Sequence, residues 1–211
     1  MRRLGTCLFV FALLGVARCT PQVPVPGDEL VGAFQMEARV LESGCVNTLA
    51  TEDLPADGGF AFEGILSRET GTGQAYLTLN GISRDGGFEG QVFTTTYSAP
   101  RQFRWKAGDA GVPCEVNDFE ISETLQVVIL SASQEQKVLV GGRCPENPSP
   151  LLEPGGVPVD PDAGIFAPEA RPEGFDAQRV CGFLVDVITP AAACEMAPCT
   201  VVYGIEGVRR Q

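Results

Sequence analysis

The segment GGFAFEGILSRETGTGQAYLTLNGISRDGGFEGQVFTTTYSAP, residues 58–100, decides the fold. Apolar and polar residues alternate in three runs within it, around 60–63, 75–80 and 88–92. Successive side chains of a β-strand point to opposite faces, so each run has one apolar and one polar face. The pattern predicts three consecutive antiparallel strands with one side of the sheet on a core.

The turns of this predicted meander are rich in glycine. Gly71-Thr72-Gly73 separates the first two runs, and Asp85-Gly86-Gly87 separates the next two. Glycine adopts positive φ angles without strain, as tight hairpin loops require. The alternation slips at Phe93, which falls on the polar parity. Either a β-bulge or a strand with both faces partly covered accounts for the slip.

The rest of the chain contains further strand-like runs. The prediction places strands at 30–41, 124–131, 137–142, 180–188 and 200–205, with Ser133–Gln136 as a hairpin turn between the second and third of these. The sum is about eight or nine strands at hairpin spacing. The expected fold class is therefore all-β, either an antiparallel barrel or a two-sheet sandwich.

A proline-rich stretch interrupts the strands. Residues 145–172 contain half of the chain's 16 prolines, and alternation vanishes there. Proline removes a hydrogen-bond donor that a sheet needs, so we interpret residues 145–178 as a surface loop within a single domain, 29–211. Such a segment is either a tolerated insertion or a ligand for an aromatic groove on a partner.

The N-terminus has the pattern of an export signal. Arg2 and Arg3 precede an apolar stretch at residues 7–16, which is too short for a stable membrane span. Val16-Ala17-Arg18-Cys19 resembles the lipobox of bacterial lipoproteins, although Arg18 stands where a small residue is usual. The resemblance implies removal of residues 1–18, acylation of Cys19 and a short tether at 19–28. Ordinary signal cleavage after Ala17 is the alternative.

Cysteine parity agrees with acylation. Of eight cysteines, Cys7 leaves with the signal and Cys19 carries the lipid, so six remain as disulfide candidates: Cys45, Cys114, Cys144, Cys181, Cys194 and Cys199. An even number in an exported chain predicts disulfides. Spacing favours Cys194 with Cys199, and Cys144 with Cys181, which would close the neck of the proline-rich loop. We expect no zinc, because histidine is absent and only one cysteine pair has near-ligand spacing.

Composition excludes several classes of activity. The absence of histidine removes Ser-His-Asp and Cys-His catalysis and histidine metal sites, and a formal charge of −12 opposes binding to nucleic acid. Acidic residues are plentiful, and Asp118, Glu120 and Glu123 form one cluster in sequence while Asp160 and Asp162 form another. A glycosidase needs two such carboxylates across a cleft, which spacing alone does not reveal. No cofactor is indicated.

An aromatic and basic segment is a candidate recognition patch. Arg101, Phe103, Arg104 and Trp105 lie together, with the chain's single tryptophan among them. An exposed aromatic between cations binds acidic or aromatic ligands, whereas a buried tryptophan here would close one end of a β-core.

These observations predict an exported, non-enzymatic binding or structural module of the bacterial envelope. It would be anchored to the outer membrane by lipid, or else be periplasmic or secreted. The export signal, the excess of arginine over lysine and the proline- and glycine-rich excursions resemble those of small lipoproteins of myxobacteria. This resemblance implies location only. One alternative is a carrier of a small apolar ligand, since Gly32-Ala33-Phe34 resembles the opening of lipocalins without their tryptophan. The other is a carboxylate-based hydrolase. An unknown protein or an apolar small molecule is the expected partner.

Overall fold

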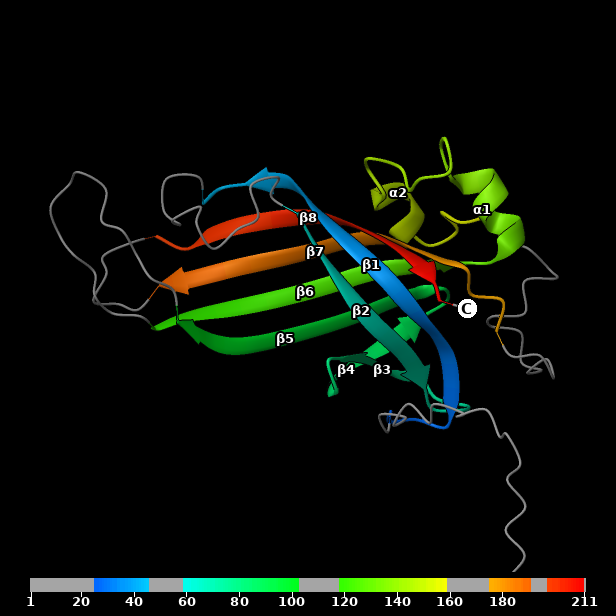
Figure 1. The fold of residues 1–211 in the computed structure, drawn as a ribbon, viewed down its shortest axis with the longest axis horizontal. Helices are drawn as coiled ribbons and strands as arrows, with labels where there is room; N and C mark the ends of the chain where they lie inside the picture. Colours follow the sequence, from blue (N-terminus) through cyan, green and yellow to red (C-terminus); the bar gives the residue numbers. More distant parts are fainter. Residues whose placement is uncertain (1–24, 46–58, 103–117, 159–174, 191–196, 211) are drawn as a thin grey trace, which may run out of the picture.

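Eight antiparallel strands close into a barrel in the order of the sequence (Figure 1). The computed structural model describes residues 25–45, 59–102, 118–158, 175–190 and 197–210. The strands are β1 Glu29–Ser43, β2 Gly59–Arg68, β3 Gln74–Leu79, β4 Ile82–Glu89, β5 Val92–Gln102, β6 Asp118–Leu130, β7 Arg179–Pro190 and β8 Cys199–Arg209. The all-β prediction is confirmed, and the barrel is the correct one of its two architectures.

The barrel closes because the first and last strands pair along most of their length. β1 pairs with β8 from Phe34 opposite Arg209 to Ser43 opposite Val201. Figure 1 shows β5 to β8 side by side, with β1 and β2 crossing them at a steep angle. Closure removes the unpaired strand edges through which β-proteins aggregate.

After β3, the turns of the predicted meander lie at other positions in the structure. The segment 59–102 contains four strands, not three, and Asp85-Gly86-Gly87 lies inside β4. The β3–β4 turn is Asn80-Gly81, whose φ angles of 49° and 80° are both positive, as a type I′ hairpin turn requires. Residues 90 and 91 form the next turn. That turn, not a bulge, places Phe93 opposite Phe88 on the inner face and explains the slip in alternation.

One end of the barrel is filled by side chains. Phe34, Phe93 and Ile129 are fully buried there, and the segment before β7 adds Phe175 as a plug. The guanidinium of Arg68 lies 4.4 Å from the centre of the Phe175 ring. The Arg209 side chain donates a hydrogen bond to the Phe175 carbonyl at 2.6 Å. This Phe175 end is a packed core.

The region between β6 and β7 is partly helical. It forms α1 Ala132–Val138 and α2 Ser149–Leu152, beside the Phe175 end (Figure 1). The predicted hairpin at 133–136 and strand at 137–142 are wrong, because Ser131 and Gln134 form a capping box that starts α1. Part of the proline-rich loop is packed, since Val157 is buried against β6 residues. None of the helices described is long and apolar enough to cross a membrane.

Two disulfides join distant parts of the described chain. Cys144–Cys181 ties the loop after α1 to β7, as predicted. Cys199 pairs with Cys45 and not with Cys194, so that prediction is wrong. The β1–β8 register brings Cys45 beside Cys199 although 154 residues separate them. Cys19, Cys114 and Cys194 lie outside the described residues.

Candidate functional site

A pocket of about 360 Å³ lies inside the barrel, toward the end that carries the Cys45–Cys199 disulfide. We call it the lumen pocket. It is lined by Phe60, Phe62, Leu77, Leu79, Asn80, Ile82, Arg84, Tyr97, Glu123, Leu125 and Leu184. Most of these side chains are apolar, and the polar ones are few, which is the usual composition of small-molecule sites.

Unequal strand lengths create the lumen pocket. β3 and β4 have 6 and 8 residues, whereas β5 and β6 have 11 and 13. The long strands therefore extend past the short β3–β4 hairpin. Ile82, at the tip of that hairpin, is 64% exposed although the register places it on the inner face beside Leu79. Phe60 is also exposed, so apolar side chains on both sides of the pocket meet solvent.

A partly buried ion pair forms the polar wall of the lumen pocket. Nη1 of Arg84 on β4 lies 2.8 Å from Oε2 of Glu123 on β6, and the two side chains are 14% and 19% exposed. The Arg84 guanidinium also lies 4.4 Å from the centre of the Tyr97 ring on β5. Three strands thus hold one cation between a carboxylate and an aromatic face, an arrangement that fixes all three side chains.

A second carboxylate stands next to the pair. Asp186 on β7 is the register partner of Glu123, and both belong to the inward-facing positions of their strands. Tyr203 on β8 is buried, and its ring meets that of Phe60 edge-on with centres 5.4 Å apart. Burial, followed by the nearby Asp186 and Glu123 carboxylates, raises the pKa of Tyr203 to about 12. The negative field of the two acids thus reaches this part of the wall.

The acidic residues that are close in sequence on β6 do not form one cluster in the structure. Glu120 is exposed on the outer face of β6, while Glu123 points into the lumen, because an odd number of positions separates them. Asp118 is the first residue of β6. Asp160 and Asp162 lie outside the described residues. The pairing of Glu123 with Arg84 was not predicted from the sequence. A signal for Glu123 was present, because it lies on the same strand face as the apolar residues Ile121 and Leu125.

The aromatic and basic patch remains a prediction. Phe103, Arg104 and Trp105 lie outside the described residues, and Arg101 is placed only as a backbone position near the end of β5. Among the described residues, no group of three or more acidic, cysteine or histidine side chains is arranged to hold a metal ion.

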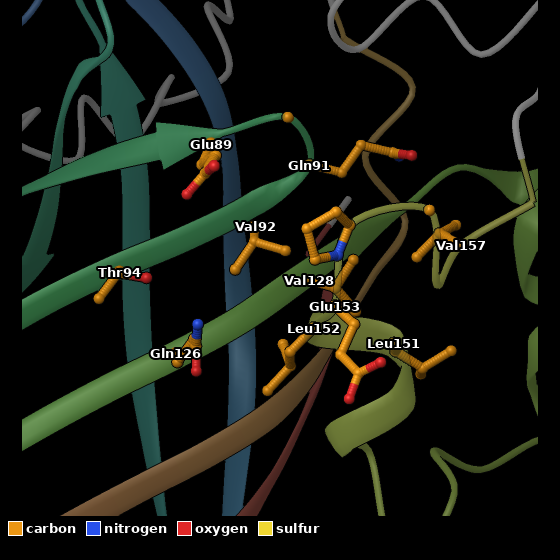
Figure 2. Close-up of a pocket in the computed structure, with 13 residues that line it drawn as sticks. Glu89, Gln91, Val92, Thr94, Gln126, Val128, Leu151, Leu152, Glu153 and Val157 are labelled. Atoms are coloured by element: carbon orange, nitrogen blue, oxygen red, sulfur yellow. The ribbon is translucent and has the colours of Figure 1, made fainter.

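A second hollow lies outside the barrel. Figure 2 shows this outer groove, of about 390 Å³, between α2 and the outer face of β5 and β6. Val92, Thr94, Gln126 and Val128 line it from the strands. None of the described side chains that line the outer groove forms an ion pair. The lumen pocket is the stronger candidate because apolar and charged groups converge there.

Comparison with protein-family models and with curated proteins finds no match for this sequence. The geometry of the lumen pocket therefore carries the functional argument alone.

Proposed function

We propose that the protein binds a small, mainly apolar molecule inside its barrel. The observation that supports this is the lumen pocket of about 360 Å³ at one end of a barrel whose other end is packed solid. A barrel made only to present an outer surface would gain stability by covering the exposed apolar side chains of that space, since burial contributes about 25 cal/mol per Å² of apolar surface. Its size is at the lower end of the range for small-molecule sites.

The proposed role is binding and not catalysis. The chain has no histidine for nucleophile activation. The ion pair between Arg84 and Glu123 is suited to orienting a polar group of the ligand. We further propose that the protein is exported and anchored to the outer membrane through lipidated Cys19, where it would hold its ligand at the envelope. Two disulfides support an oxidising compartment.

A fluorescence titration with N-phenyl-1-naphthylamine, a neutral apolar probe, tests the binding role. We expect saturable binding at one site with a rise in emission. Leu79→Trp places a larger side chain in the lumen pocket and should remove that site. Val187→Trp, which makes the same kind of change on the outer face of β7, is the matched control and should leave it intact.

Two results would overturn the binding role. One is no saturable emission from the native protein. The other is equal binding by the Leu79→Trp and Val187→Trp variants when circular dichroism shows both to be folded, because the probe would then sit outside the lumen.

A further inference from the structure

The charges around the lumen pocket discriminate between ligand classes, and this inference rests on the proposed function. An anionic head group would need the Arg84 guanidinium, which already has Glu123 at 2.8 Å and the Tyr97 ring at 4.4 Å. Displacing Glu123 would leave its carboxylate, 19% exposed, without its cation. Leaving a buried charge unpaired is costly, so the pocket opposes anions.

A cationic head group meets the opposite situation. Nη1 of Arg84 is close to Glu123 Oε2, yet it is not aligned for a hydrogen bond, and among the described residues no other donor reaches that buried oxygen. A carboxylate accepts several hydrogen bonds, so Glu123 can keep Arg84 and receive a further N–H. The register partner of Glu123 is another carboxylate, Asp186. Both acids contribute to the raised pKa of Tyr203, so the electrostatic potential on this side of the barrel interior is negative.

Aromatic side chains complete the surroundings. Phe60, Phe62 and Tyr97 line the lumen pocket, and the rings of Phe60 and Phe62 lie 5.7 Å apart. Ring faces attract cations, most strongly where water is excluded. The formal charge of −12 of the whole chain would also steer cations toward the protein.

We propose that the lumen pocket takes an apolar molecule whose polar end is a protonated amine. The tail occupies the space among Phe62, Leu79 and Leu184, and the ammonium group donates to the Glu123 carboxylate, which lines the pocket and is 19% exposed. Arg84 acts as a positioning residue, because it holds the Glu123 carboxylate in place.

Calorimetric titration with decylamine, decanol and decanoate tests this ligand class, because the three probes share one tail and differ in the head group. At neutral pH and below their micelle concentrations, decylamine should bind at least about tenfold more tightly than decanol, as expected for a hydrogen bond to a buried charge. Decanoate should bind most weakly.

Variants assign the preference to a residue. Glu123→Gln should reduce the amine preference over decanol to about threefold or less and should strengthen decanoate binding, because Arg84 loses its partner. Glu120→Gln, on the outer face of the same strand, should change nothing. If Glu123→Gln does not fold, the double variant Arg84→Gln/Glu123→Gln removes both charges of the pair and should likewise reduce the amine preference over decanol to about threefold or less.

The outcomes separate the two proposals. No binding of any probe overturns the proposed function and this inference with it. Binding in which decanol or decanoate equals or exceeds decylamine overturns the amine head group alone. An amine preference that persists unchanged in folded Glu123→Gln also overturns it.

Discussion

Replacing Arg84 by methionine should destabilise the barrel strongly, because the change leaves Glu123 in the lumen without its cation. Removing one member of a fully buried pair costs about 3–5 kcal/mol. Here the Glu123 side chain is 19% exposed, and residual solvation lowers the expected cost to about 2–3 kcal/mol. Loss of the contact with the Tyr97 ring adds about 0.5–1 kcal/mol. The expected total is about 3 kcal/mol.

A double-mutant cycle isolates the pair. Arg84→Met together with Glu123→Leu replaces both charges by apolar groups, and such replacements are often neutral or stabilising. The double variant should therefore recover most of the loss, with a coupling free energy of about 2 kcal/mol. Urea unfolding followed by circular dichroism measures each free energy of unfolding.

The matched control is an exposed ion pair of the same type. Arg210 pairs with Glu63 on the outer surface, where the side chains are 52% and 46% exposed. Arg210→Met should cost less than about 1 kcal/mol, since exposed pairs contribute little. Equal losses for Arg84→Met and Arg210→Met, or a coupling free energy near zero, would refute the reasoning that the lumen pair is buried and interdependent.

Three further predictions concern the disulfide, a strand contact and alkaline pH. Replacing Cys45 and Cys199 by alanine should lower the free energy of unfolding by about 5 kcal/mol, because the bond closes a loop of 154 residues, and a stability unchanged in urea would contradict this. Gly182→Ala should lower the free energy of unfolding by about 3 kcal/mol or more, since the new Cβ would lie 2.0 Å from the Gln126 carbonyl oxygen. The control Gly73→Ala should lower it by less than about 1 kcal/mol in the same assay, because the nearest atom to that Cβ is 3.5 Å away. The Tyr203 phenol ionises near pH 12 in the folded chain and near pH 10 in the unfolded chain, so the stability that it contributes is complete below pH 10 and is lost as pH rises to 12. Tyr203→Phe should flatten this loss, and identical alkaline profiles for both proteins would count against it.

Strand alternation made most of the barrel predictable. β1, β7 and β8 follow runs of alternating residues, and Cys144–Cys181 follows from the need to close a long loop. The two-residue turns were harder because glycine is dense in the whole segment, although Asn80-Gly81 carries a strong hairpin signal. α1 was missed because its capping residues also suit a turn.

The lumen pocket depends on relations between strands that one sequence does not contain. Arg84, Tyr97 and Glu123 come from three strands, and the signal at Glu123, a charge on an apolar face, does not name its partners. Only the register shows that they share one face, and only barrel closure turns that face inward. The same reason hides Cys45–Cys199, whose partners meet through pairing of the first and last strands.

Chemical-shift mapping of backbone amides during titration with decylamine tests the central claim most directly, because it locates the ligand. Binding in the lumen predicts the largest shifts at Phe62, Leu79, Arg84 and Glu123, which line the lumen pocket from four different strands. Shifts concentrated at Val92, Gln126 and Leu152 would place the ligand in the outer groove and would contradict the account.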